Sequence, residues 1–165
     1  IAQIRARGLL AAVAAIWLLI QYQGVMQNLL LVSGLIMLGY ALYHAFKLPK
    51  DTEEQKNVRA AAIFNSTLNA AHVPLHVCED SVKIMELALK CADDGNVNAI
   101  SDSMSGFAMS RAALTAAGYN VRININSLED KSAGDKMLKE LAALEKKADK
   151  LEKEIHKVMR ERGGI

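Results

Sequence analysis

A regular apolar repeat near the C-terminus constrains the fold more than any other feature of the sequence. Its members follow alternating steps of four and three residues over three heptads: Met137, Leu141, Leu144, Ala148, Leu151, Ile155 and Val158. This spacing places them along one face of an α-helix, and Lys, Glu and Asp fill the other faces. Gly163 and Gly164 follow, where a helix C-terminus favours glycine. The repeat predicts a long amphipathic helix with one partner face, typical of a helical bundle or a dimer.

The rest of the chain also has apolar residues at helical spacing and almost no strand pattern. Pro49, within residues 47–52, cannot continue the preceding helix, which should end there. Asp51 or Thr52 can then cap a new helix. We expect that helix to run to about His72 and another to start at Pro74 and end near residues 94–95. The sequence therefore predicts an all-α fold, a bundle of long helices.

A third internal helix is expected to begin at Ser101 and to end at Gly118. Its apolar positions are mostly alanine, and such small side chains permit close approach of another helix. After Gly118, residues 119–127 alternate polar and apolar side chains. This segment is compatible with a short strand, an extended loop or the first turns of the next helix.

Charge divides the chain into two parts. Residues 8–46 contain no charged side chain, whereas residues 47–165 contain 18 basic and 18 acidic residues. An apolar run over residues 9–20 is too short to cross a bilayer, but residues 25–46 are long enough. A helix that is apolar on every side is either a membrane span or the central helix of a bundle, and the pattern leaves both open.

The even balance of charges argues against nucleic-acid binding, which needs an excess of Lys and Arg to neutralise phosphates. Cys78 and Cys91 lie 13 residues apart in predicted helices, without the cysteine framework of a secreted protein. We therefore expect reduced thiols and a cytoplasmic protein. His72, His76 and Cys78 have spacings that could gather a metal, but Pro74 is expected to place His72 before the helix that carries His76 and Cys78, so no metal site is predicted.

One carboxylate stands out as a candidate for chemistry. Ser101 is a natural N-cap, which puts Asp102 in the first turn of the small-residue helix. The partial positive charge of a helix N-terminus stabilises an ionised carboxylate there. The pattern is typical of an ordinary cap, but the same carboxylate could act as a base or stabilise a cation beside the small-residue surface.

Four segments, in this order and spacing, carry a resemblance to a known family: Leu48-Pro49-Lys50-Asp51-Thr52-Glu53-Glu54-Gln55-Lys56, Val73-Pro74-Leu75, Gly95-Asn96-Val97-Asn98-Ala99-Ile100-Ser101-Asp102 and Asn120-Val121-Arg122-Ile123-Asn124. Over about residues 45–165 the chain resembles the formiminotetrahydrofolate cyclodeaminase and methenyltetrahydrofolate cyclohydrolase family. The resemblance implies an all-helical homodimer, or a higher homo-oligomer, that acts on a tetrahydrofolate derivative without a covalently bound cofactor. It also implies that Asp102 takes part in the reaction.

The two reactions of this family share an electron-poor one-carbon centre between N5 and N10 of tetrahydrofolate. A fixed carboxylate can stabilise the cation of 5,10-methenyltetrahydrofolate and move the proton when ammonia leaves or water attacks. The resemblance therefore suggests Asp102 as the catalytic residue and Ser101, Asn120 and Asn124 as substrate contacts. Hydrogen bonds within turns and caps are an equal alternative for the two asparagines.

The first 46 residues depart from the family pattern. No lysine occurs before Lys47 and no acidic residue before Asp51, so the lysine expected to meet the folate and the acidic partner of Asp102 have no counterpart. The segment is also shorter than the pattern by about a helix. A divergent member with impaired activity, a fused apolar hairpin and a wrongly assigned N-terminal sequence would each explain this departure.

The leading hypothesis is a single cyclodeaminase-like helical domain over residues 1–165, in which residues 1–46 are an atypical apolar helical segment. Its function would be that of a cyclodeaminase or a cyclohydrolase. The alternative is a membrane-anchored or structural helical protein with an apolar N-terminal hairpin and no catalysis.

Overall fold

The computed structural model describes residues 39–165. The chain divides into two compact units, Ile1–Lys47 and Leu48–Ile165. In the first unit, residues 39–47 are helical. The predicted apolar segment over residues 9–20 and most of the one over residues 25–46 lie outside the described part. Among the described helices, none is long and apolar enough to cross a membrane.

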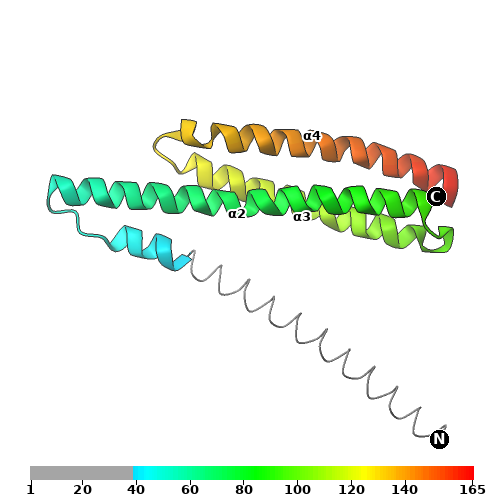
Figure 1. Cartoon of the computed structure of the whole chain (residues 1–165), viewed down its shortest axis with the longest axis horizontal. Coiled ribbons are helices and arrows are strands. Elements are labelled where there is room, and N and C mark those ends of the chain that lie inside the picture. The colour runs from blue at the N-terminus through cyan, green and yellow to red at the C-terminus, as the bar shows by residue number, and fades with distance from the viewer. Residues whose placement is uncertain (1–38) are drawn as a thin grey trace, which may run out of the picture. The chain divides into compact units, whose positions relative to one another are not determined.

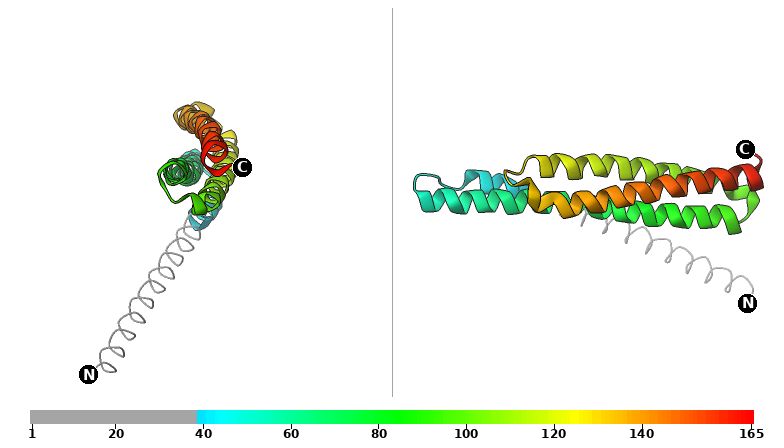
Figure 2. Two further views of the ribbon diagram at one scale, coloured as in Figure 1. Left: turned by 90° about the vertical axis from the view of Figure 1, so that its right-hand side faces the viewer. Right: turned by 90° about the horizontal axis from the view of Figure 1, so that it is seen from above.

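The second unit consists of three long helices that lie side by side: α2 (Glu53–Asp94), α3 (Ile100–Asn126) and α4 (Asp135–Val158) (Figures 1 and 2). They run in alternating directions. Short 3-10 turns, Val97–Ala99 and Lys131–Gly134, precede α3 and α4, and a π-helical turn, Met159–Gly163, follows α4. Residues 39–165 contain no strand, so the all-α prediction is confirmed for this part of the chain.

The start of α2 agrees with the sequence. Thr52 caps the helix with its hydroxyl, which accepts a hydrogen bond from the backbone N–H of Gln55 at 3.2 Å. The Gln55 side chain accepts in return from the N–H groups of Thr52 and Asp51, at 3.2 and 3.0 Å. This reciprocal arrangement is a capping box, which satisfies backbone donors that have no partner inside the helix.

The predicted break between His72 and Pro74 is wrong, because α2 continues through Pro74 for 42 residues in all. Proline has no N–H, so the carbonyl of Ala70 loses its helical partner. Asn124 of α3 replaces that partner, since its side-chain Nδ2 donates to the Ala70 oxygen at 3.2 Å. Ala71 and Leu75, on either side of the proline, are both buried in the bundle. Tertiary contacts thus hold the helix across a residue that usually ends one.

The predicted end of α3 at Gly118 is also wrong, because the helix runs on to Asn126 and residues 119–126 form its last two turns. Gly118 is buried where α4 comes close. A Cβ at this position would lie 3.3 Å from a Glu145 oxygen and 3.4 Å from Leu141 Cδ1. The glycine therefore serves helix packing and not helix termination.

The predicted heptad face of α4 is confirmed. Five of its residues are buried and the remaining two, Leu144 and Val158, are partly buried against the same core. Cross-helix ion pairs flank this face: Arg122 Nη2 to Glu145 Oε2 at 2.7 Å, Lys147 Nζ to Glu86 Oε1 at 2.6 Å, and Arg111 with Asp149. Gly164 ends the helix with a φ of 69°, a left-handed conformation that favours glycine.

Candidate functional site

Asp102 lies in the first turn of α3 with an exposed side chain, as the sequence predicts. Ser101 is not the N-cap. The 3-10 turn Val97–Ala99 leads directly into α3, which begins one residue earlier, at Ile100. The N-cap is Ala99, without a side-chain hydrogen bond, and the Asn96 side chain instead accepts from the N–H of Asn98 at 3.0 Å. Ser101 is exposed beside Asp102 in the first turn.

The π-helical turn after α4 packs near the start of α3. Ile100 is buried, and Gly163 leaves the space that its side chain occupies, because a Cβ at Gly163 would lie 3.3 Å from Ile100 Cγ2. Arg162 holds the C-terminus of α2 by donating to the carbonyls of Ala92 and Gly95, the latter at 3.1 Å. The π-helical turn after α4 therefore contacts both Ile100 at the start of α3 and the C-terminus of α2.

Asn120 lines an open hollow of about 410 Å³ near the other end of α3, together with Tyr119, Arg122, Ile123 and Asn126. These five residues have the spacing of one helical face. Because residues 119–127 were not assigned to this helix from the sequence, the hollow was missed. Continuing the helical period past Gly118 would have brought all five together.

The two asparagines differ in how their amides are used. Asn120 is exposed, and its Nδ2 donates to the Ala116 carbonyl at 3.0 Å. Asn124 is partly buried, and its Nδ2 donates both to Ala70 of α2 and, at 2.9 Å, to the Asn120 carbonyl. Asn124 therefore holds α2 and α3 together at Pro74, a role that the sequence did not indicate.

The predicted site residues fall into two groups on one helix. Asp102 and Ser101 lie at its start, and Asn120 lies 18 residues further on. At 1.5 Å per residue this separation is about 27 Å. Within one copy of the chain, the fold does not bring the carboxylate and Asn120 to the same reacting atom.

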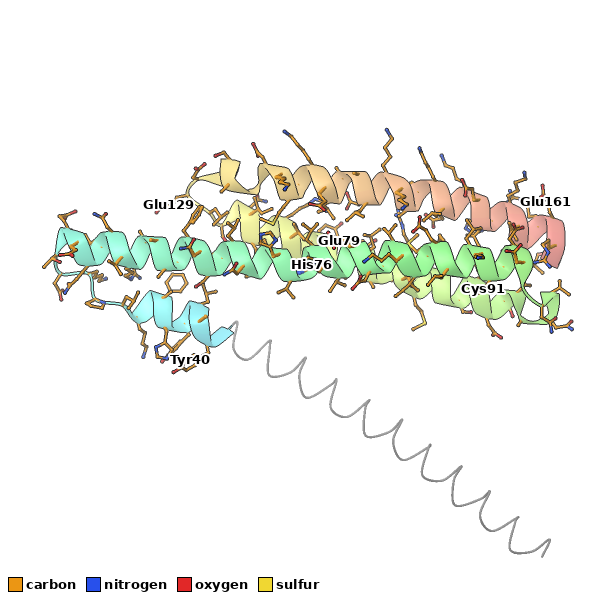
Figure 3. All side chains as sticks on the ribbon, in the orientation of Figure 1. Tyr40, His76, Glu79, Cys91, Glu129 and Glu161 are labelled. Atoms are coloured by element: carbon orange, nitrogen blue, oxygen red, sulfur yellow. The ribbon has the colours of Figure 1, made fainter. Side chains whose placement is uncertain are left out.

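Within residues 39–165, the other histidines and acidic residues do not gather into a metal site. His72 lies in the same helix as His76, contrary to expectation, because α2 continues through Pro74, and its side chain is exposed. His76 and Glu79 lie one turn apart on α2 (Figure 3), 2.9 Å from Nδ1 to Oε2. The hydrogen bond from His76 lowers the pKa of Glu79. The described residues contain no group of three metal ligands.

The two cysteines are free thiols that differ in exposure. Cys91 is exposed, whereas Cys78 is buried and donates to the Leu114 carbonyl at 3.6 Å. Burial, with Glu145 nearby, raises the pKa of Cys78 to about 11. A buried neutral thiol of this kind is unreactive.

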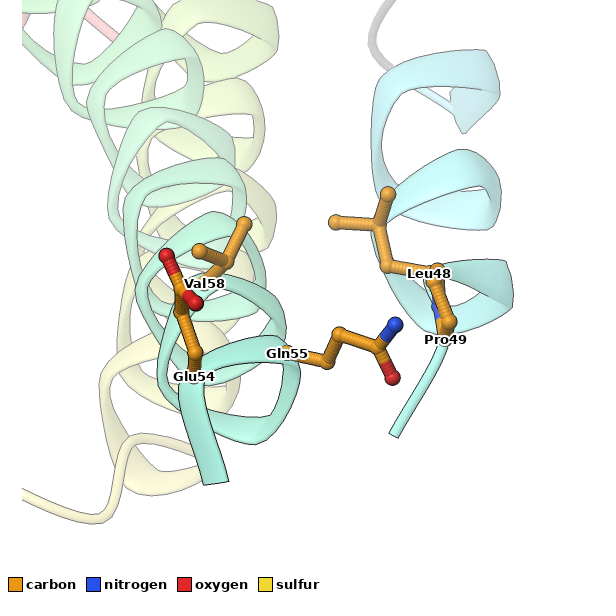
Figure 4. Close-up of a pocket in the computed structure, with 5 residues that line it drawn as sticks. All are labelled: Leu48, Pro49, Glu54, Gln55 and Val58. Atoms are coloured by element: carbon orange, nitrogen blue, oxygen red, sulfur yellow. The ribbon is translucent and has the colours of Figure 1, made fainter. Parts of the chain in front are cut away.

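The segment that begins with Leu48 and Pro49 forms a second, smaller hollow of about 230 Å³ with Glu54, Gln55 and Val58 (Figure 4). Its lining is mainly apolar, and the Gln55 side chain is engaged in the capping box described above. The residues around this hollow therefore belong to the N-terminus of α2 and its cap.

Comparison with known proteins identifies relatives of the chain. The methenyltetrahydrofolate cyclohydrolase of Methylorubrum extorquens is 35% identical over 120 residues, which are 73% of this chain and 58% of that protein. The formimidoyltransferase-cyclodeaminase of Gallus gallus is 37% identical over 89 residues, 52% of this chain and 16% of that protein. The corresponding enzyme of Mus musculus is 30% identical over 90 residues, 54% of this chain and 17% of that protein.

The chain thus spans less than two thirds of each of these relatives. The sequence model of the formiminotransferase-cyclodeaminase family matches residues 40–143, more than half of the 165 residues. This match includes α2, α3, Asp102 and both asparagines. The chain therefore belongs to the formiminotransferase-cyclodeaminase family.

Proposed function

We propose that the protein acts on the one-carbon bridge between N5 and N10 of tetrahydrofolate, as a methenyltetrahydrofolate cyclohydrolase or a formiminotetrahydrofolate cyclodeaminase. The observation that carries this proposal is the exposed carboxylate of Asp102 in the first turn of α3, inside the part of the chain that matches the family. The names of the relatives support both activities.

The chemistry of the two reactions suits a fixed carboxylate. The bridge of 5,10-methenyltetrahydrofolate carries a delocalised positive charge, which a carboxylate within a few ångströms stabilises. In the cyclohydrolase direction, water adds to the cationic carbon, Asp102 accepts the proton that the water loses, and one of the two carbon–nitrogen bonds of the bridge then breaks. In the cyclodeaminase direction, N10 attacks the formimino carbon, and Asp102 accepts the proton that N10 loses and delivers it to the nitrogen that leaves as ammonia when its bond to that carbon breaks.

Ser101 and the asparagines are proposed as substrate contacts. Ser101 is exposed and adjoins Asp102 in the sequence, and Asn120 lines the open hollow on α3. Asn124 has both amide hydrogens engaged in the bundle, which leaves its side-chain oxygen as the group for a ligand. We further propose a cytoplasmic homodimer that needs no covalently bound cofactor.

The test is turnover of 5,10-methenyltetrahydrofolate, followed by its absorbance, with and without Asp102→Ala. We expect the substitution to lower kcat by roughly 100-fold or more, because proton transfer by a positioned group contributes about 10²–10⁴-fold. Asp135→Ala is the matched control, since Asp135 is also an exposed acidic residue in the first turn of a helix, α4. Equal losses from both substitutions, or a wild-type protein without turnover, would remove the proposal.

A second assay distinguishes the two reactions. Ammonia release from 5-formiminotetrahydrofolate indicates the cyclodeaminase, and loss of 5,10-methenyltetrahydrofolate without prior ammonia release indicates the cyclohydrolase. Because the cationic species is common to both, Asp102→Ala should impair whichever reaction the protein performs.

A further inference from the structure

The connection from α2 to α3, residues 95–99, lies at the same end of the bundle as the π-helical turn after α4 (Figures 1 and 2). Two hydrogen bonds fold this connection locally: the N–H of Asn98 donates to the Asn96 side chain, and the N–H of Ala99 donates to the Asn96 carbonyl, both at 3.0 Å. Asp102 lies three residues beyond the connection. The backbone of the connection therefore leads directly to the candidate catalytic carboxylate.

Arg162, in the π-helical turn, departs from the apolar repeat of α4. The repeat passes through Leu151, Ile155 and Val158, and its next step of four residues falls on Arg162. The buried residue of this turn is instead Met159. Single π-helical turns occur frequently at functional sites, and so do residues that break a local pattern. The position of this arginine therefore calls for an explanation from its contacts.

Those contacts lie at the C-terminus of α2. The last turn of α2 contains Asp93 and Asp94 and no basic residue, although the negative end of a helix dipole favours cations. Arg162 supplies the cation from α4. Its Nη1 donates to the Ala92 carbonyl, and its Nη2 donates to the Gly95 carbonyl at 3.1 Å. The planar guanidinium thus bridges the last turn of α2 and the first residue of the connection.

Gly163, the next residue, contacts the other end of the connection. Ile100 is the first residue of α3 and is 6% exposed. A Cβ on Gly163 would lie 3.3 Å from Ile100 Cγ2, closer than most Cβ contacts, so glycine allows this approach. Two consecutive residues of the C-terminal turn therefore contact the connection before and after it.

We propose that Arg162 is a positioning residue for Asp102. Together with Gly163, it fixes the connection at both ends and so sets the direction in which the first turn of α3 presents the carboxylate. Because the Asp102 side chain is exposed, its backbone determines where the carboxylate can reach. Arg162 lies beyond residues 40–143, which match the family. The catalytic part of this inference rests on the proposed function, whereas the contact itself does not.

The first test is the steady-state turnover of the folate substrate by Arg162→Gln. We expect kcat to fall about tenfold with little change in KM, since a displacement of about 1 Å can cost about 10²-fold in rate. Arg162→Lys should lose less, because it keeps the charge but not the planar fork. Arg160→Gln, which removes an exposed arginine from the same turn, is the matched control and should change neither constant. An unchanged kcat in Arg162→Gln, or an equal loss in Arg160→Gln, would overturn the proposal.

A double substitution tests whether Arg162 acts through the carboxylate. When Arg162→Gln is added to Asp102→Ala, kcat should fall by less than about twofold further, because the group that the arginine positions is already absent. A further loss of about tenfold would show that Arg162 affects turnover by another route, and would contradict a role in positioning Asp102.

Hydrogen exchange tests the contact without any substrate. Arg162→Gln should raise the exchange rates of the amides of residues 95–102 about fivefold or more, while exchange in the middle of α4 and the helical circular dichroism stay unchanged. Arg160→Gln should leave all of these rates as in the wild type. Unchanged exchange at residues 95–102 in Arg162→Gln would overturn the positioning role. If the wild type has no turnover, the proposed function fails, and exchange still decides whether Arg162 holds the connection.

Discussion

Helices α3 and α4 pack against the same core, yet their outer faces are opposite in character. α4 has 13 Asp, Glu, Lys and Arg residues among its 24, whereas α3 has three among its 27. Leu114 on α3 and Leu141 on α4 are equally inaccessible, each with 0% exposure. Both helices therefore bury apolar side chains in the bundle core, and they differ in the number of charged residues on the face that points away from it.

The outer face of α4 is therefore suited to contact with water, and the outer face of α3 is not. A charged outer face is well solvated and needs no partner, while a row of alanines with exposed Met, Tyr and Ile gains free energy when it is covered. The acidic residue proposed for catalysis lies on the helix whose outer face is apolar.

The largest expected effect concerns the inner faces, where the two helices should behave alike. Leu114→Ala and Leu141→Ala should each lower the free energy of unfolding by about 2–5 kcal/mol, because each leaves a cavity in a closely packed core. Urea unfolding measures both. A cost below about 1 kcal/mol for only one of them would break the equivalence of the inner faces.

The thiol against the inner face of α3 should be protected. Because its pKa is raised to about 11 from 9.0, Cys78 holds roughly 100-fold less thiolate near neutral pH than an ordinary cysteine. Iodoacetamide at pH 8 should modify Cys91 in the folded protein and Cys78 only after unfolding, as mass spectrometry of peptides would report.

The same raised pKa has a consequence for stability at high pH. The folded state binds the Cys78 proton more tightly than the unfolded state does. The contribution of this thiol to the free energy of unfolding is therefore complete below pH 9 and is lost as the pH rises towards 11.

For the labelling experiment, rapid modification of Cys78 in the native protein would mean that α3 does not cover this thiol.

The contact between α3 and the proline in α2 should have an intermediate effect. Asn124→Ala removes the side-chain donor to Ala70 and should cost about 1–3 kcal/mol, since a partly buried carbonyl loses its hydrogen bond. Asn126→Ala, an exposed position on the same helix, is the control.

A double-mutant cycle with Pro74→Ala isolates this contact. Alanine at position 74 supplies a backbone N–H to Ala70, so Asn124→Ala should cost less in that background than in the wild type. Equal costs in both backgrounds would show that Asn124 does not compensate for the proline.

The smallest effect is expected from the ion pair that joins α3 to α4. Arg122 and Glu145 are 2.7 Å apart with side chains 40% and 32% exposed, so the pair should contribute only about 0.2–1 kcal/mol. A cycle of Arg122→Ala and Glu145→Ala, followed by urea unfolding at low and high salt, measures it. A coupling well above that range would mean that charge, and not the apolar face, holds α4 in place.

Sequence patterns predicted α4 well and α3 less well, for one physical reason. Where an apolar face meets a charged face, as in α4, the helical period and its ends are evident. In α3, small and apolar residues occur on every side, so the pattern does not show where the helix ends. Gly118 was therefore taken as its C-terminus, and residues 119–127 were not assigned to it. Asp102 lies in the first turn of α3 as predicted, although the predicted cap, Ser101, is not the N-cap, because the 3-10 turn before α3 moves the start of the helix to Ile100.

Other features depended on residues far away in the sequence. Pro74 ends a helix by local rules, but the Asn124 amide, 50 residues further on, supplies the hydrogen bond that the proline removes. The hollow around Asn120 was likewise missed, because its five lining residues share a face only if the helix continues past Gly118.

The sequence by itself determined the all-α class, a helix start capped at Asp51 or Thr52, the core face of α4 and the family, because these follow from local spacing and from motifs in order. Only the tertiary structure decided that α2 passes through Pro74, that α3 passes through Gly118 and that Asp102 lies about 27 Å along the helix from Asn120. Contacts between helices keep α2 helical at Pro74 and accommodate Gly118 within α3. These contacts join residues far apart in the sequence, so no local sequence pattern can predict them.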